Sequence, residues 1–91
     1  MIEAKIYIAL KSGILDPQGK TVHHALENLG IAQIGSIRIG KFIQLQFTED
    51  VGKQEAERLT VKACEKLFAN PVIEDYRFEL FDAPAKEQGA I

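Results

Sequence analysis

The sequence predicts an α+β domain, in which two helices cover one face of an antiparallel sheet. Residues 2–10, and again the residues from 72 onward, alternate between apolar and polar side chains, as strands with one covered face do. Residues 17–29 and 53–69 instead repeat apolar side chains at helical spacing. The resulting order, β-α-β-β-α-β, predicts a ferredoxin-like arrangement.

The first and last strands are expected from their alternation. In the stretch Ile2–Leu10 the even-numbered residues are apolar and share one face. The last strand follows Asn70-Pro71, because Pro71 lacks an N–H and disfavours helical geometry at the residue before it. Its side chains divide into an apolar and a charged set, which are Tyr76, Phe78 and Leu80 against Asp75, Arg77 and Glu79. A strand so charged on one face belongs to an antiparallel or mixed sheet with one covered face, or it meets a charged partner.

Capping residues and apolar stripes predict the two helices. Asp16 is a preferred N-cap residue and Pro17 is favoured at the first helical position, so the first helix is expected to run to about Leu29, where Gly30 ends it. Its buried stripe would be Val22, Ala25, Leu26 and Leu29. The second helix is expected over Lys53–Ala69, with an inner stripe of Ala56, Leu59, Ala63 and Leu67.

The segment between the helices has two interpretations. Its apolar residues at odd positions would share one face, namely Ile37, Ile39, Ile43, Leu45 and Phe47. They fit two strands, at about Gln33–Ile39 and Lys41–Phe47, or one long strand bent at Gly40, since glycine in a strand often marks a bend. No strong two-residue hairpin signal decides between the two.

Length and composition restrict the class of protein. The 91 residues make one domain, expected over 1–81, with a flexible tail at 82–91. The net charge of −2, with acids and bases mixed, argues against a nucleic-acid binder. No apolar run is long enough to cross a membrane and no secretory leader is recognisable, so a cytoplasmic location is expected. The single cysteine, Cys64, excludes an internal disulfide.

The second face of the predicted sheet has the composition of a protein interface. It would carry aromatic and charged side chains together, which are Lys5, Tyr7, Arg38, Phe42, Asp75 and Arg77. This set is too mixed for a core, and aromatic residues and arginine are enriched at interfaces. Since a domain of this size also has a small core, we expect a homodimer or a higher even-numbered oligomer.

No catalytic or metal-binding set is recognisable in the sequence. His23 and His24 are neighbours on the first helix and cannot form the i, i+4 pair that binds a metal, so we expect one to be half-buried and the other solvated. Cys64 has no activating base and is interpreted as a small buried apolar group. The chain is therefore not expected to be an enzyme by itself.

Two short segments have both a structural and a binding interpretation. Asp16-Pro17-Gln18-Gly19 caps a helix and could also contact a partner, but it lacks the glycine-rich run and the lysine of a phosphate loop. Arg38-Ile39-Gly40-Lys41 is either a solvated bend or a charged contact with a subunit or a phosphate.

Longer stretches resemble the small subunit of phosphoribosylformylglycinamidine synthase, the PurS family. The matching stretches are Leu15-Asp16-Pro17-Gln18-Gly19 with His24-Ala25-Leu26, then Ile37-Arg38-Ile39-Gly40-Lys41, and the long run from Cys64 to Phe78. The long run is specific, whereas each shorter stretch would be weak evidence by itself. Together they span residues 15–78 in the order found in the family.

The resemblance implies a PurS-like fold and a role in the fourth step of purine synthesis. In such systems a large synthetase subunit uses ATP to convert formylglycinamide ribonucleotide into formylglycinamidine ribonucleotide, and a glutaminase subunit supplies the ammonia. The small subunit is implied to be non-catalytic, to dimerise, and to bridge the other two while assisting ammonia transfer. ATP and Mg would act on the synthetase, so no cofactor is expected on this chain.

The candidates for partner contacts are Asp16, Pro17, Gly19, His24, Arg38, Gly40, Lys41, Asn70, Asp75, Tyr76 and Arg77. An alternative function is that of a dimeric small-molecule-sensing regulatory domain, in which the loop before the first helix would hold the ligand. Fold analogy is its only support. An RNA-binding sheet would need a basic surface, which the acidic balance opposes.

Overall fold

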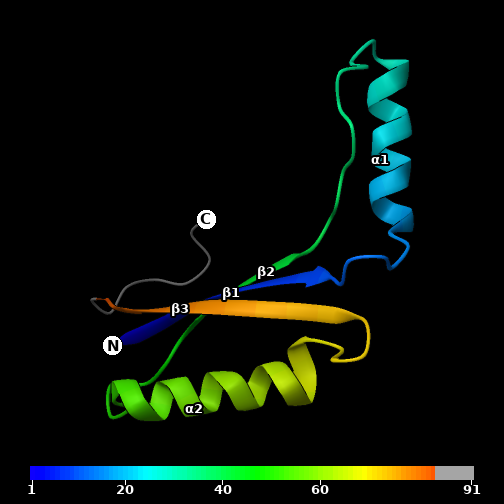
Figure 1. The fold of residues 1–91 in the computed structure, drawn as a ribbon. Helices are drawn as coiled ribbons and strands as arrows, with labels where there is room; N and C mark the ends of the chain where they lie inside the picture. Colours follow the sequence, from blue (N-terminus) through cyan, green and yellow to red (C-terminus); the bar gives the residue numbers. More distant parts are fainter. Residues whose placement is uncertain (84–91) are drawn as a thin grey trace.

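The computed structural model describes residues 1–83, which form a three-stranded antiparallel sheet and two helices. Strand β1 (Ile2–Leu10) is the central strand, with β2 (Lys41–Gln46) on one side and β3 (Glu74–Asp82) on the other. Figure 1 shows the sheet with α2 (Lys53–Ala63) along one of its faces, and α1 (Pro17–Asn28) standing beyond its end. No helix of residues 1–83 is long and apolar enough to span a bilayer.

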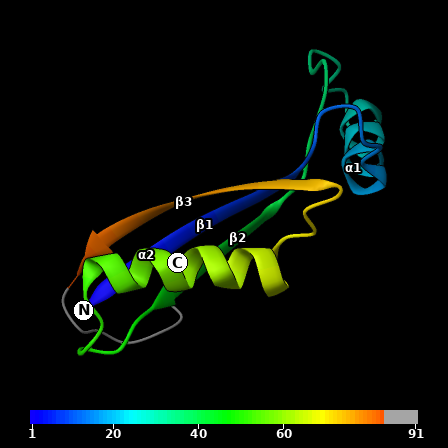
Figure 2. The ribbon, with the colours of Figure 1, turned by 60° about the horizontal axis from the view of Figure 1, so that its bottom comes forward.

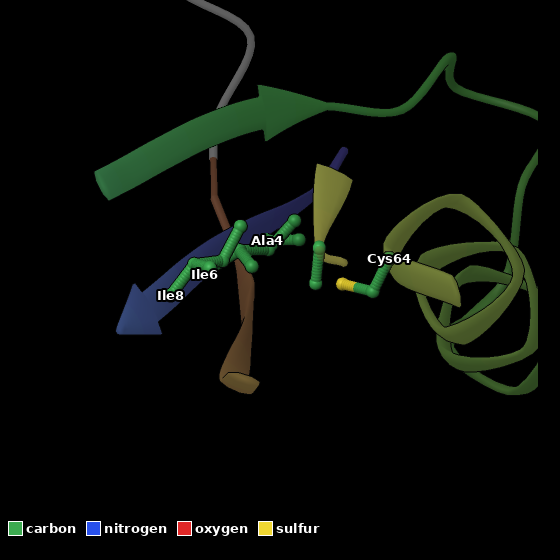
Figure 3. Close-up of a cluster of buried hydrophobic side chains, with 5 residues drawn as sticks. Ala4, Ile6, Ile8 and Cys64 are labelled. Carbon is green, nitrogen blue, oxygen red and sulfur yellow. The ribbon is translucent and has the colours of Figure 1, made fainter. Parts of the chain in front are cut away.

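The core lies between α2 and the even-numbered residues of β1. Ala4 and Ile6 have no exposed surface, and Ile8 is almost as deeply buried. Figure 3 shows their side chains directed towards Cys64, which follows α2 and is itself fully buried. The partly buried side chains packed on this cluster come from all three strands and the end of the second helix, and they are Ile43, Leu45, Phe47, Phe68, Tyr76, Phe78 and Leu80.

The second helix changes its geometry in its last turns. It begins at Lys53 as expected, but α2 ends at Ala63 and a π-helical turn, η1 (Cys64–Phe68), continues it. The N–H of Ala69 donates to the carbonyl oxygen of Cys64 (2.9 Å), five residues earlier, in place of the usual bond to the fourth residue before it. The wider turn leaves Cys64 against the sheet and ends the helix before Asn70-Pro71.

The prediction of an α+β fold with an antiparallel sheet is confirmed, with two differences in detail. The described sheet has three strands, and α1 does not lie on the face that α2 covers. In Figure 2, α1 remains apart from the layer formed by the strands and α2. The radius of gyration is 16.6 Å, against about 12 Å for a compact domain of this length.

The segment between the helices matches neither of its two interpretations completely. β2 begins at Lys41, while residues 31–40 are extended and belong to no strand of the described sheet. At Gly40 the backbone meets the carbonyl group of Ile8, so closely that a Cβ atom would overlap the Ile8 oxygen. Gly40 therefore marks the beginning of the paired strand rather than a bend within a longer one.

The last strand begins two residues later than predicted, because residues 70–73 form a turn. The side chain of Asn70 accepts a hydrogen bond from the N–H of Val72 (3.0 Å), and the Asn70 carbonyl accepts from the N–H of Glu74 (2.7 Å). β3 then extends through Asp82, and the N–H of Ala83 donates to Met1. Residues 82 and 83 of the predicted tail are therefore paired in the structure, and the rest of that prediction, 84–91, lies outside the described residues.

We predict that Gly40→Ala lowers the free energy of unfolding by about 1–3 kcal/mol, because the added methyl group requires the backbone of β1 or the start of β2 to shift. Urea denaturation followed by circular dichroism measures the change. Gly35→Ala is the matched control, since a Cβ atom there meets nothing within 4 Å, and it should alter stability by less than about 0.5 kcal/mol. Equal stability of the two variants would contradict the close contact at Gly40.

Candidate functional site: an open sheet face and the junction of the arm

The sheet has a second face, which no helix of residues 1–83 covers. We call it the open face, and its side chains are Lys5 and Tyr7 of β1, Phe42 and Gln44 of β2, and Arg77, Glu79 and Phe81 of β3. The pairing of the strands places these residues side by side, because residues opposite each other in a sheet point to the same face. Phe42 and Phe81 each expose 42% of their surface. This is the aromatic and charged face that the sequence predicts.

Tyr7 is the centre of this face. It lies opposite Phe42 on one side and opposite Arg77 on the other. The two rings are 5.2 Å apart between centroids, and the Arg77 guanidinium lies 4.1 Å from the Tyr7 ring centroid. A second cation, the ammonium of Lys5, lies 5.0 Å from the Phe81 ring. Each cation–π contact is worth about 0.5–1 kcal/mol at an exposed site, so these contacts favour the arrangement of rings and cations on the open face.

A second cluster joins the sheet to α1. We call residues 12–39 the arm, and the place where it meets β1 and β2 the junction. The carboxylate of Asp16 accepts a hydrogen bond from the N–H of Gly19 (2.9 Å) at the start of α1, as an N-cap residue does. Its other oxygen accepts from the N–H of Ile39 (2.8 Å), just before β2. Both hydrogen bonds stabilise the ionised carboxylate, and the bond from Ile39 has the larger effect. They lower the pKa of Asp16 below its ordinary value of 3.8.

Gly19 and Arg38 complete the junction. A Cβ atom at Gly19 would lie 2.6 Å from the carbonyl oxygen of Ile37, so only glycine lets the two ends of the arm approach this closely. The guanidinium of Arg38 donates to the carbonyl oxygen of Leu10, at the end of β1, and to that of Lys11 (3.2 Å). Hydrogen bonds therefore hold the two ends of the arm together at the point where they leave the sheet.

Lys41 connects the junction to the turn before β3. Its ammonium donates to the carbonyl oxygen of Phe68 (3.2 Å) and lies 4.0 Å from a carboxylate oxygen of Glu74. The other oxygen of Glu74 accepts from the N–H of Asn70 (2.7 Å). The first residue of β2, the end of η1 and the first residue of β3 thus meet at one corner of the molecule.

The structure divides the predicted contact residues among several places. Asp16, Gly19, Arg38 and Gly40 meet at the junction, where Pro17 begins α1. Lys41 and Asn70 lie at the adjoining corner, and Asp75 and Arg77 point to the open face. Tyr76 instead packs on the core cluster, and His24 is exposed on α1. Whether these residues touch a partner stays a prediction. The contacts within the chain explain why Gly19 and Gly40 leave no room for a Cβ atom.

The list of candidates omits Tyr7, Phe42 and Glu74, which organise the open face and the corner. Tyr7 and Phe42 were recognisable as members of the second sheet face, but the register that places Arg77 on Tyr7 required the structure. The pairing of Glu74 with both Asn70 and Lys41 had no signal in the sequence beyond its opposite charge.

The histidines and the cysteine have the structural roles that the sequence suggests. His23 is half-buried, and its Nε2 lies 2.8 Å from the carbonyl oxygen of Ile34 in the arm, while His24 is exposed and pairs with Glu27 at 3.7 Å. Burial raises the pKa of the Cys64 thiol, and the nearby Glu65 adds to this effect. Among residues 1–83, no group of three or more His, Cys, Asp or Glu side chains could hold a metal ion.

An open face of aromatic and charged side chains and a projecting arm are features expected of a small interaction subunit. The comparisons with known proteins identify the family. Residues 3–82 match the model of the PurS family, described as phosphoribosylformylglycinamidine (FGAM) synthase. The chain is 41% identical over 86 residues to the phosphoribosylformylglycinamidine synthase subunit PurS of Bacillus subtilis, covering 94% of this chain and all of the relative.

Solved structures agree with the sequence match. A crystal form of Bacillus subtilis PurS superposes with a TM-score of 0.81 at 40% identity, over 90% of this chain and all of that one. A chain in the structure of PurLQS from Thermotoga maritima gives a TM-score of 0.75 at 29% identity, over 89% and 99% of the two chains. The chain therefore belongs to the PurS family of phosphoribosylformylglycinamidine synthase subunits.

We predict that the Asp16→Asn variant unfolds at lower urea concentration than the parent at pH 7, and that the difference shrinks in acid. The asparagine keeps one acceptor oxygen but presents an amide group where the second N–H needs an acceptor. Because folding lowers the pKa of Asp16, the carboxylate stabilises the folded chain above about pH 4, and this contribution disappears as the pH falls through the folded-state pKa.

Urea midpoints of both proteins measured between pH 7 and pH 2.5 test this dependence. Asp75→Asn is a suitable control, because its exposed carboxylate makes one ion pair, with Lys11 at 3.8 Å. A difference between parent and Asp16→Asn that stays constant over the whole range would show that the charge of Asp16 does not hold the junction.

We also predict that Cys64 does not react with iodoacetamide in the folded chain at pH 7. It has no exposed surface and its raised pKa keeps it as the neutral thiol, which is a poor nucleophile. Mass spectrometry should find no adduct in buffer and full labelling in denaturant. Rapid labelling of the folded chain would mean that η1 opens and exposes the thiol.

Proposed function

We propose that this chain is the non-catalytic subunit that joins the synthetase and glutaminase of phosphoribosylformylglycinamidine synthase and assists the transfer of ammonia between them. The complex would convert formylglycinamide ribonucleotide into formylglycinamidine ribonucleotide with ATP and glutamine. Ammonia at neutral pH is mostly ammonium, which is not a nucleophile, so an enclosed path between the two active sites has a chemical purpose. Family membership over residues 3–82 is the observation that carries this proposal.

The open face supports a role in assembly. Its side chains come from three strands of a rigid sheet and combine rings with charges of both signs. Aromatic residues and arginine held in this way are typical of the residues that dominate binding energy at interfaces. A chemical role would instead require a nucleophile or a general base in a pocket, and Cys64, the strongest nucleophile by residue type, is buried in the core.

The partners and location that we propose follow the same reasoning. The chain would act in the cytoplasm as a homodimer or a higher even-numbered oligomer, in contact with both other subunits and with no nucleic acid. A free cysteine is compatible with that reducing compartment. ATP and Mg would act on the synthetase subunit, and we expect this chain to bind no cofactor of its own; equilibrium dialysis with ATP would test that expectation.

We predict that Arg77→Ala weakens assembly with the other two subunits about tenfold or more, because arginine is among the residues that most often contribute over 1.4 kcal/mol at an interface. Titration of the variant into synthetase and glutaminase should then show reduced glutamine-dependent activity that recovers at higher concentration. Activity of the synthetase with an ammonium salt should change much less, since ammonia supplied externally needs no transfer between subunits.

Arg58→Ala is the matched control for this experiment. The side chains of Arg58 and Arg77 are exposed to 64% and 67%, but Arg58 lies on α2, away from the open face. If Arg77→Ala assembles normally and abolishes activity with both nitrogen sources, the chain contributes to the chemistry and the bridging function is wrong. If the parent chain does not co-purify with the two subunits, the proposal fails at its first step.

A further inference from the structure

Strand β3 lies at one border of the sheet and presents a long edge. It has nine residues, whereas β2 at the other border has six. Figure 2 shows β3 at this border, with β1 between it and β2. Its register with β1 continues without a break from Glu74 to Asp82, and it contains no proline. Shortness, bulges and prolines are common protections of a sheet edge against further pairing, and β3 has none of them.

The hydrogen bonds at the two ends of β3 show which of its backbone groups face away from β1. Ala83 donates to the carbonyl oxygen of Met1 (2.8 Å) and accepts from its amine (2.9 Å), and the N–H of Lys11 donates to Ile73 (2.8 Å). Along an antiparallel ladder, residues that bond to the neighbouring strand alternate with residues whose N–H and C=O groups point outward. The odd-numbered residues of β3 therefore bond to β1. We call the outward groups between them the β3 edge, and they belong to Tyr76, Phe78 and Leu80. No strand of residues 1–83 pairs with this edge.

The side chains of β3 determine what kind of strand could be added at this edge. The three side chains of the β3 edge point to the core face and are only partly buried, and the two rings among them are stacked with centroids 6.5 Å apart. Asp75, Arg77 and Glu79 point to the open face and are exposed, so that the charge alternates from negative to positive to negative. Opposite charges on neighbouring strands stabilise a sheet, and like charges destabilise it. A complementary strand is therefore apolar on one side and carries basic, acidic and basic residues on the other.

We propose that the β3 edge binds an extended segment of a partner subunit, which joins the sheet as a strand antiparallel to β3. The outward backbone groups would supply the hydrogen bonds, and the alternating side chains would supply the selectivity. The basic residues of the segment lie opposite Asp75 and Glu79, and its acidic residue lies opposite Arg77. The inference rests on the proposed function and deepens it, because it gives one segment of a partner a defined place beside the open face.

Amide hydrogen exchange measured by NMR tests the edge directly. The probe is a blocked seven-residue peptide with valine at alternate positions and lysine, glutamate and lysine between them. In the free chain the N–H groups of the β3 edge should exchange at least tenfold faster than those of Arg77 and Glu79, which bond to β1. Saturating peptide should slow exchange at the β3 edge at least tenfold and leave the other two unchanged.

Two results of this measurement would overturn the proposal. One is the absence of binding at millimolar peptide. The other is a β3 edge already protected in the free chain, which would show that a second copy or another segment of the same chain covers it.

Two altered peptides distinguish strand addition from other kinds of binding. N-methylation of the valines removes the N–H donors that face β3 and should abolish binding. Exchange of the charges to glutamate, lysine and glutamate places like charges opposite each other, and should raise the dissociation constant at least about tenfold. Equal binding of all three peptides would mean a contact without backbone pairing or charge selection, and would contradict the proposal.

The variant Glu79→Lys tests the charge order from the side of this chain. It should lower the preference for the first peptide over the charge-exchanged one, because a lysine then lies opposite a lysine. Glu55→Lys on α2 is the matched control, and it should leave that preference unchanged. Glu55 and Glu79 expose 52% and 49% of their side chains, and each pairs with an arginine of its own element, at 3.4 and 3.6 Å. Equal preferences of the two variants would contradict the assignment of the edge.

The complete complex separates this inference from the proposed function. In a complex of the parent chain with synthetase and glutaminase, the N–H groups of the β3 edge should be protected as they are by the peptide. An assembled complex in which they still exchange rapidly would overturn strand addition and leave the bridging function standing. A parent chain that binds the peptide but does not co-purify with the two subunits would instead contradict the bridging function.

Discussion

The arrangement of this chain depends on one carboxylate that accepts hydrogen bonds from two segments far apart in the sequence. Asp16 caps α1 through Gly19 and at the same time accepts from Ile39, twenty-three residues away. The second bond ties the capped helix to the segment just before β2, where Arg38 also bonds to the end of β1. With it, the two ends of the arm are joined at the point where they leave the sheet, and the direction of α1 is determined by the junction rather than by packing on a core.

This constraint has consequences for both surfaces of the sheet. Because α1 is held past the end of the sheet, the core face is covered by α2 alone in the described chain. The fully buried cluster is confined to β1 and the end of the second helix at Cys64 and Ala69, and side chains of β2 and β3 around it are only partly buried. The open face is organised differently, by contacts across the strands that centre on Tyr7. The molecule therefore presents two surfaces of different chemistry, one apolar and incomplete and one aromatic and charged, as a subunit with more than one partner requires.

The sequence predicted those parts of the fold that depend on residues close together in the chain. The alternation in Ile2–Leu10 identifies β1 because the side-chain period of a strand is two, and the same period places Arg77 and Tyr76 on opposite faces of β3. Asp16 and Pro17 mark the start of α1 because capping is a local interaction. The π turn at Cys64–Phe68, in contrast, was not predicted: the sequence continues the helical pattern through it, and the contacts of its ends, with the core cluster at Cys64 and with Lys41 at Phe68, come from distant segments.

The sequence by itself therefore determined the class of fold, the helix starts, the two faces of the outer strand β3 and, through its longer motifs, the resemblance to a family. Each of these depends on neighbours within a few residues. The tertiary structure decided that 31–40 stay unpaired and that α1 leaves the sheet, because both depend on contacts of Asp16, Arg38 and Gly40 with residues more than twenty positions away. Periodicity records which face of a segment is apolar, but not which surface, in the same chain or another, will cover it.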